Sequence, residues 1–369
     1  MDLTNDCHPV FDGLLRRCVE LNASDIHITS SVEPYYRVDN AVIKDGEESI
    51  SAKTVAEIVD SLLTPQQWEV LRQEMSIDVA FFWENWQRFR VNVFYQRNSL
   101  AMAIRRLDDK YRSFAELHLP TRLSELAEYP HGLVIVTGPT GSGKSTTLAT
   151  VINEINLRRQ GHVITIEDPI EYVHRNKQCL IQQRQLYTDV PSFASAVRAA
   201  LREDPDVLLV GEMRDMATIR AAVTAAETGH LVFSTLHTGE AIGAIDRMIS
   251  VFPAEEQVAV RDQLSRVLRC VVSQRLVARA DHHGRVPAVE IMQVNDAVSN
   301  LIRIGQSNQI ESVMQTGGTE GMMILEQSLA ELTARRLIDE SEAATIARDR
   351  NVYTSRLAVA RQMFKAQAV

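Results

Sequence analysis

The stretch that decides the fold runs Gly138-Pro139-Thr140-Gly141-Ser142-Gly143-Lys144-Ser145 and is followed by Thr146. It fits the pattern G-x-x-x-x-G-K-[ST], between an apolar run and a helical pattern. Such glycines let backbone N–H groups close around phosphate oxygens at a helix start, whose dipole favours anions. Lys144 would reach the β- and γ-phosphates and Ser145 would ligate Mg²⁺. The stretch therefore predicts a site for ATP and Mg²⁺, and a merely flexible glycine loop is the weaker alternative.

Short, unbroken apolar runs lie on both sides of this loop, and helical patterns separate them. The runs are 133–136, 163–166, 207–210 and 231–233. Short apolar strands that alternate with helices are typical of a parallel sheet covered on both faces, so we predict an α/β domain. From about residue 254 the pattern predicts mostly helix, with a strand-like interruption at 286–292.

Three of these strands end in acidic or imidazole side chains. Glu167 and Asp168 follow the first strand after the glycine loop, Glu212 follows the next and His237 follows the last. Ligands of open α/β sheets bind at the carboxyl ends of the strands. A carboxylate there can hold Mg²⁺-bound water or orient the attacking water, and we expect Glu212 in that role. Asp168 could instead cap the following turn.

His230 precedes the strand that His237 ends, so the two histidines lie at opposite ends of it. Access of His230 to a nucleotide does not follow from one sheet. An ordinary structural histidine is the interpretation that we prefer for His230 taken alone.

The first hundred residues have another pattern. Alternation predicts strands at 25–29 and 89–95, and an i, i+3, i+4 apolar spacing predicts a helix at 55–63. A second helix is predicted over 10–21, with one face made of Val10, Leu14, Cys18 and Leu21. We therefore expect a small α+β domain over 1–108, a polar linker over 109–120 and the α/β domain over 121–369.

Composition excludes several classes of protein. The chain has 369 residues, and 39 basic against 48 acidic side chains leave a net charge of -9, which argues against a general nucleic-acid coat. The four cysteines are scattered, with no spacing typical of a metal site. The start of the chain lacks the pattern of a signal peptide, and no run is long enough for a membrane-spanning helix. We expect a cytoplasmic protein, soluble or peripherally attached to a larger assembly.

Four segments in order resemble the Walker A, Asp box, Walker B and His box of the secretion ATPase superfamily. They are 137–146, 165–172, 202–215 and 226–231. Within that superfamily the chain most resembles the PilT-like ATPases, which drive type IV pilus retraction. Three further segments are similar, at 23–27, 251–256 and 315–318.

The resemblance implies a RecA-like P-loop ATPase domain with a helical C-terminal region and a PAS-like N-terminal domain. It also implies a ring-shaped homohexamer at the cytoplasmic side of an inner-membrane pilus or secretion machine. The implied partners are an inner-membrane pilus platform protein and, for an accessory role, a second pilus ATPase. Lys144, Glu167, Glu212 and His237 would be catalytic.

Two arginines acquire a role from the same resemblance. Arg90 and Arg105, fifteen positions apart, match two N-terminal-domain arginines that close over the phosphates in related ATPases. Guanidinium groups from a small domain would couple its angle to the nucleotide state. Without the family, a solvated strand face would be the simpler interpretation of Arg90.

The expected function is an ATP-hydrolysing motor that powers pilus retraction, in which pilins are disassembled and cells twitch. Ser299 stands where retraction ATPases usually carry an arginine, in Ala297-Val298-Ser299-Asn300-Leu301-Ile302. Two alternatives stay open. One is an ATPase that energises type IVB or type II-like secretion, since the scattered cysteines do not exclude a type IVB enzyme. The other is a PilU-like accessory ATPase or scaffold that assists a second motor, because Tyr95-Gln96-Arg97-Asn98 is closer to PilU-like ATPases and Ser299 departs from the retraction pattern.

Overall fold

A computed structural model describes residues 7–38, 41–46, 48–84, 87–107, 111–281 and 284–367, with side chains to 364. The chain forms two compact units. The first comprises 1–110 with 171–173, and the second comprises 111–170 with 174–369. The predicted linker 109–120 begins with two residues outside the described ranges and continues inside the second unit, so it stays a prediction.

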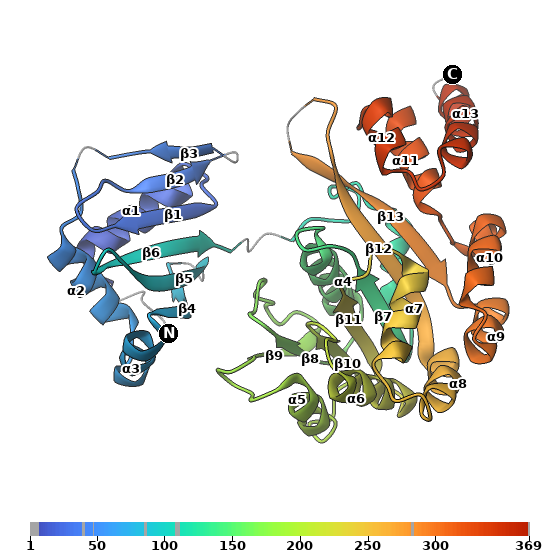
Figure 1. Cartoon of the computed structure of the whole chain (residues 1–369), viewed down its shortest axis with the longest axis horizontal. Coiled ribbons are helices and arrows are strands. Elements are labelled where there is room, and N and C mark those ends of the chain that lie inside the picture. Colours follow the sequence, from blue (N-terminus) through green and yellow to red (C-terminus); the bar gives the residue numbers. More distant parts are fainter. Residues whose placement is uncertain are drawn as a thin grey trace. The chain divides into compact units, whose positions relative to one another are not determined.

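The first unit is built on a six-stranded antiparallel sheet with the strand order β3-β2-β1-β6-β5-β4 (Figure 1). Its strands are β1 (Asp25–Thr29), β2 (Tyr35–Val38), β3 (Ala41–Lys44), β4 (Ser76–Trp83), β5 (Gln87–Gln96) and β6 (Ser99–Arg106). Its helices are α1 (Pro9–Glu20), α2 (Ala52–Leu62) and α3 (Pro65–Glu74). The strands predicted at 25–29 and 89–95 and the helix predicted at 55–63 are confirmed as β1, β5 and α2.

The predicted face of the first helix is confirmed only in part, because Cys18 is buried and Leu14 and Leu21 pack against the core, but Phe11 and Leu15 were not predicted there. The buried residues of α1 are Phe11, Leu15 and Cys18, whereas Val10 is 43% exposed. Phe11 packs its ring 5.6 Å from the ring of Phe81, centroid to centroid. The stripe that contains Val10 and the stripe that contains Phe11 both have helical spacing. The helix buries the stripe with Phe11, because its aromatic ring removes the larger apolar area from water.

The second unit is built on a seven-stranded sheet with the order β13-β12-β7-β11-β10-β8-β9. All neighbours are parallel except β12 and β13, two long strands that run side by side in Figure 1. The strands are β7 (Gly132–Thr137), β8 (Gly161–Glu167), β9 (Cys179–Gln185), β10 (Val207–Val210), β11 (Leu231–Leu236), β12 (Leu268–Ala278) and β13 (Arg285–Gln293). The four predicted parallel strands are confirmed as β7, β8, β10 and β11.

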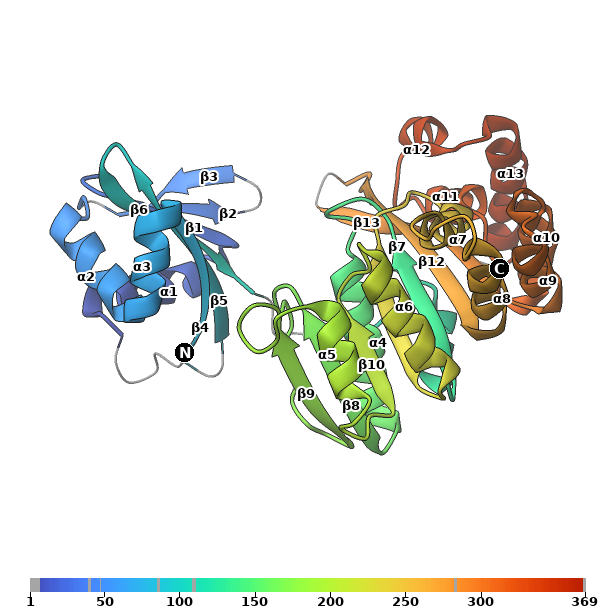
Figure 2. The same cartoon turned by 60° about the horizontal axis from the view of Figure 1, so that its bottom comes forward.

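Helices cover both faces of this sheet, which is the predicted α/β architecture. Along β7, Leu133 and Ile135 join one buried cluster, and Val134 and Val136 join the other. The first cluster lies under α5 (Phe193–Ala200), α6 (Met216–Glu227), α7 (Ala241–Ser250) and α8 (Gln257–Val267), and the second under α4 (Lys144–Arg158) and η1 (Thr121–Glu128). Figure 2 shows α5 and α6 over the face turned to the viewer.

The C-terminal region is mostly helical, as predicted. Its helices are α9 (Asp296–Ile304), η2 (Ser307–Gln309), α10 (Ile310–Thr316), η3 (Gly317–Glu320), α11 (Leu325–Ala334), α12 (Glu340–Ile346) and α13 (Arg350–Gln367). Among the described residues, no helix is long and apolar enough to cross a membrane.

One strand was predicted as helix. The stretch 268–278 is β12, and it pairs with β7, the strand that enters the glycine loop. Its residues Cys270, Val271 and Val272 are all fully buried, because helices cover both faces of the sheet. A strand that is buried on both faces has no alternation to separate it from a buried helix.

Candidate nucleotide site

The glycine loop 138–143 connects the end of β7 to the first residue of α4. A Cβ atom at Gly138 would lie 2.2 Å from the backbone oxygen of Gln274, and one at Gly143 would lie 2.7 Å from the side-chain nitrogen of Gln274. Both glycines also have positive φ, 147° and 88°. Only glycine fits these two positions, so the loop keeps the bare backbone cradle that phosphate oxygens need.

Lys144 lies against this loop. Its Nζ donates to the carbonyl oxygens of Gly138 at 2.9 Å and Pro139 at 3.1 Å, and the residue is 9% exposed. The hydroxyl of Ser142 is buried and has no hydrogen-bond partner in the described part of the chain. Ser145 and Thr146 follow in the first turn of α4. An ammonium group and an orphaned hydroxyl in one glycine-rich loop suit the phosphates of a nucleotide.

Gln274 of β12 braces the loop, and sequence reasoning missed it. Its Nε2 donates to the carbonyl oxygen of Ser142 at 2.6 Å, and its Oε1 accepts from the hydroxyl of Thr147 in α4 at 2.8 Å. The residue is 3% exposed. The signal that could have found it is the β-branched pair Val271 and Val272, which favours a strand over a helix.

The ends of β8 and β10 lie side by side, because Gly211 N donates to the carbonyl oxygen of Ile166 at 2.7 Å. Glu167 Oε1 accepts from the Thr165 hydroxyl at 2.6 Å and from Gln183 Nε2 at 3.0 Å. Asp168 follows it and is exposed. Glu167 and Asp168, which were predicted at the end of β8, therefore lie at the same edge of the sheet as the Gly211–Glu212 turn.

Glu212 and His237 meet at this edge. His237 Nε2 lies 3.1 Å from Glu212 Oε2, and the Glu212 side chain is only 14% exposed and also pairs with Arg214. Burial, and then the positive charges of Lys144 and Arg214, lower the pKa of His237 from 6.5. These effects favour the neutral imidazole, whose Nε2 contact with Oε2 holds the carboxylate in place.

The residue after His237 ties this loop to the strand of the phosphate loop. The Thr137 hydroxyl lies 2.8 Å from the carbonyl oxygen of Thr238 and accepts from Thr238 N at 3.0 Å. Three neighbouring strand ends, those of β7, β10 and β11, are thereby held together by side chains. That arrangement places a carboxylate, an imidazole and an ammonium group around one loop that suits phosphate.

His230 lies apart from these residues. It precedes β11 at the end opposite His237, and its Nδ1 lies 2.9 Å from the carbonyl oxygen of Ala225 and 3.2 Å from the Thr228 hydroxyl. These contacts connect the His230 ring to the carboxyl end of α6. Such contacts also suit a histidine with a structural role.

Arg90 and Arg105, in the first unit, are direct neighbours across the β5–β6 hairpin. Side chains of directly paired residues project from the same face of the sheet. Each guanidinium has a carboxylate partner, since Arg90 Nε lies 3.3 Å from Asp78 Oδ1 and Arg105 Nε lies 2.8 Å from Asp25 Oδ1. Their side chains are 41% and 67% exposed, so the hairpin explains the spacing of fifteen and presents both cations to solvent.

No group of three or more His, Cys, Asp and Glu side chains within the described ranges could hold a metal ion. Mg²⁺ at phosphate sites does not need such a group, because it keeps several waters and binds through few protein oxygens plus the phosphates. The residues present therefore suit Mg²⁺ that arrives with a nucleotide.

Comparisons with known proteins agree with this geometry. The chain is 48% identical over 305 residues to a twitching motility protein of Neisseria gonorrhoeae, covering 83% of this chain and 82% of the relative. It is 43% identical over 330 residues to the type IV pilus retraction ATPase PilT of Pseudomonas aeruginosa, covering 89% and 96%. A crystal structure of the pilus retraction motor PilT with bound ADP superposes with a TM-score of 0.86, at 42% identity and with 92% and 97% covered.

These similarities extend over nearly the whole length of each protein, so they concern both units and not the glycine loop alone. They establish the predicted fold class and an ATPase lineage. A protein family described as type II/IV secretion system protein matches residues 5–368. The chain therefore belongs to the type II/IV secretion system protein family.

Proposed function

We propose that this protein is a homohexameric ATPase whose hydrolysis of ATP powers type IV pilus retraction and twitching motility. One observation carries the proposal above the others: the buried Glu212 is held by His237 at the strand end beside the Lys144 loop. Its relatives are named for retraction and twitching and match over more than four-fifths of both chains.

The glycine loop is the part of the site that binds the phosphates. The backbone N–H groups of 140–143 and of the first turn of α4 donate to the phosphate oxygens, and Lys144 exchanges its carbonyl partners for the β- and γ-phosphates. The Ser142 hydroxyl gains the partner that it lacks. This exchange stabilises the negative charge that ATP brings to the loop.

Only a few protein oxygens are needed to bind Mg²⁺. We propose that the Ser145 hydroxyl ligates Mg²⁺ and that Glu167 and Asp168 hold water in its outer shell. Bound Mg²⁺ supplies compensation for the charge that develops on the β- and γ-phosphate oxygens.

Glu212 orients the water that attacks the γ-phosphate. His237 holds the carboxylate through Oε2, and Oε1, which lies close to Arg214, has no hydrogen-bond partner in the described part of the chain and is left to bind water. Phosphoryl transfer depends mainly on such positioning and on charge stabilisation, so a fixed carboxylate at this edge serves hydrolysis.

Arg90 and Arg105 would exchange their carboxylate partners for phosphate, because guanidinium binds it in two-point geometry.

Purified full-length protein tests the enzymatic part. Glu212→Gln should still bind ATP and should lose at least about a hundredfold in turnover, because the amide cannot accept the proton of an attacking water. Glu340→Gln, an exposed glutamate on α12, is the matched control and should keep the wild-type rate. A normal rate in Glu212→Gln would remove Glu212 from catalysis. Light scattering with ATP tests the hexamer, and a monomer alone would contradict it.

Deletion of the gene in the source organism tests the cellular part. Cells should become hyperpiliated and lose twitching, and wild-type protein should restore both properties while Glu212→Gln should not. Intact pili together with lost protein export would overturn retraction in favour of a secretion ATPase. A defect that appears only when a second pilus ATPase is weakened would select the accessory role instead.

A further inference from the structure

The loop that follows β11 carries His237 and ends where α7 begins, at Ala241. The next four residues after His237 are each held by a different part of the second unit. Thr238 is bonded to Thr137 of β7, as described above. Gly239 O accepts from the Ser273 hydroxyl at 3.0 Å and from an Arg275 amino group at 3.4 Å, both on β12.

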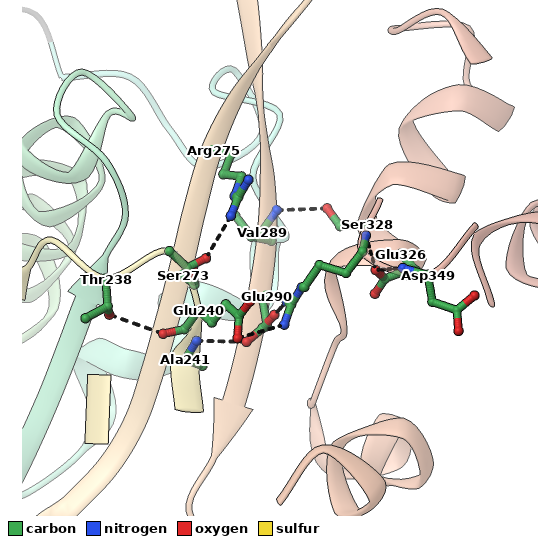
Figure 3. A network of polar contacts seen from close by, with 12 residues as sticks. Thr238, Glu240, Ala241, Ser273, Arg275, Val289, Glu290, Glu326, Ser328 and Asp349 are labelled. Carbon is green, nitrogen blue, oxygen red and sulfur yellow. Dashed lines mark hydrogen bonds and ion pairs between the residues drawn. The ribbon is translucent and has the colours of Figure 1, made fainter. Parts of the chain in front are cut away.

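Glu290 of β13 holds the last residue of this loop (Figure 3). Its Oε1 accepts from Ala241 N at 2.8 Å, which satisfies one of the unpaired amides at the start of α7. Glu290 is 3% exposed. A carboxylate that is buried this deeply requires a cationic partner, because an uncompensated charge is very costly in the interior.

Arg348, between α12 and α13, is that partner. Its guanidinium pairs with Glu290 and lies 3.5 Å from Glu240 Oε2, so it contacts two acids that flank Ala241. Its own backbone is fixed, because Arg348 N donates at 2.9 Å to Glu326 Oε1 of α11, which Asp349 N also approaches. Figure 3 shows Glu240 and Glu290 gathered on one side of β13 and Glu326 and Asp349 farther along the network.

Arg348 supplies the positive charge that compensates the two carboxylates beside it. Glu240 and Glu290 face its guanidinium, and Arg275 of β12 is the nearby like charge. Without Arg348, Glu290 would be buried opposite a second carboxylate and would have to rotate or admit water. Either change removes the acceptor of Ala241 N and releases Glu240, at a distance of three residues from His237.

We propose that Arg348 is a positioning residue for hydrolysis: through Glu290 and Glu240 it holds the loop 237–241 so that His237 meets Glu212. The C-terminal helices α11 to α13 thereby acquire control over the geometry of the catalytic edge. Any force or partner that shifts the turn at Arg348 changes the rate of hydrolysis without touching the nucleotide. This inference rests on the proposed function, since it assigns a purpose to the same edge.

The first test does not depend on hydrolysis. Hydrogen exchange of the full-length protein should show faster exchange in peptides that cover 237–241 in Arg348→Ala, with the peptides of the glycine loop unchanged. Arg361→Ala is the matched control, because it removes an equal charge from a pair with Glu340 that is half exposed on α12 and α13. Unchanged exchange at 237–241, or an equal increase in the control, would overturn the proposal even if the protein were no ATPase.

The second test is kinetic. In Arg348→Ala, kcat for ATP should fall about tenfold or more, because an ångström of misplacement in a catalytic group costs up to about a hundredfold. KM and the Kd for ADP should change less than about twofold, since the glycine loop is intact, and Arg348→Lys should recover part of kcat. A wild-type chain without ATPase activity would contradict the proposed function alone, because the exchange test would still decide the role of Arg348.

The double variant Glu290→Gln with Arg348→Gln separates positioning from stability. It leaves no buried unpaired charge, so its melting temperature should lie above that of Arg348→Ala. Glu240 still lacks its partner, and the proposal requires kcat to stay at least about threefold below wild type, within the range that misplacement produces. Full recovery of kcat with the melting temperature would mean that Arg348 acts on stability only, and the proposal would be wrong.

Discussion

Gln274 holds Ser142 by a hydrogen bond of 2.6 Å from its side-chain Nε2 to the backbone oxygen. The bond joins β12 to the glycine loop, which is 132 positions away in the chain. The loop is therefore shaped by a strand on its flank as well as by its own glycines.

Gln274→Met should weaken nucleotide binding about tenfold and lower stability by about 2 kcal/mol, because the thioether keeps the volume but leaves Ser142 O and the Thr147 hydroxyl unpaired. Titration with a fluorescent ADP analogue and thermal melting measure the two effects. Gln263→Met, at a partly exposed position of α8, is the control and should change neither. Equal affinity in Gln274→Met and wild type would show that the loop keeps its shape unaided.

Arg90→Ala and Arg105→Ala should each lower the hydrolysis rate of the assembled protein at least about tenfold. Arg90→Ala should leave the melting temperature within about 2 °C, since its pair with Asp78 is exposed. Arg105→Ala should lower the melting temperature further, because it leaves the buried Asp25 with Arg37 at 3.7 Å as its remaining ion-pair partner among the described residues. Lysine at either position should restore only part of the rate, because an ammonium lacks the two-point geometry. Arg72→Ala, an exposed arginine on α3, is the control. If both variants hydrolyse ATP normally, the two arginines belong to a solvated strand face.

His237 should impose an acid limit on hydrolysis. The pKa of His237 is lowered by burial and by the nearby Lys144 and Arg214. The acid limb of the profile of kcat against pH should therefore lie below pH 6.5. Above this limb the neutral ring leaves Glu212 free to act as acceptor, and below it the imidazolium ties the carboxylate into an ion pair. The dependence of kcat on pH in wild type and in His237→Gln measures this. Persistence of the same limb in His237→Gln would assign it to another group.

His174 should make stability depend on pH. It is 8% exposed, its ring stacks on Tyr111 at 5.0 Å, and burial followed by Lys177 lowers its pKa to about 3. Between that value and its unfolded value, the unfolded chain binds the extra proton, so stability falls as the pH falls. The loss from pH 7.5 to 5.5 should be about 1 kcal/mol.

His174→Phe keeps an aromatic ring against Tyr111 and should remove that part of the pH dependence. Denaturant unfolding of both proteins at the two pH values gives the difference. An unchanged slope in His174→Phe would mean that His174 takes up a proton in the folded state as readily as in the unfolded chain.

Ser299 should matter to the contact between two helices and not to the chemistry. Its hydroxyl on α9 donates to the carbonyl oxygen of Ser265 on α8 at 2.6 Å. Ser299→Ala should therefore lower stability by about 1 kcal/mol and leave kcat unchanged. Ser250→Ala is the control for thermal melting and ATPase assays, because Ser250 is an exposed residue whose hydroxyl bonds within its own helix, α7. A fall in kcat would assign Ser299 a part in coupling.

The glycine motif, the order of strands and helices and the acids at the strand ends were readable from the sequence, because each depends on residues that are near one another in the chain. The turn at 138–143 requires glycine, and apolar runs flanked by turns predict strands whatever the rest of the chain does. Parallel strands also end at one edge, so Glu212 and His237 could be expected there before their contact of 3.1 Å was seen.

Tertiary packing decided the rest. The face of α1 that is buried depends on Phe81, a residue far along the chain, and local spacing favoured Val10 equally. The stretch 268–278 is a strand because it pairs with β7, and its burial on both faces removed the alternation that would have marked it. Gln274 and Arg348 act across 132 and 58 positions, and no local pattern specifies such partners. The sequence by itself determined that phosphate would be bound, and the tertiary structure decided which distant side chains hold the binding loop in shape.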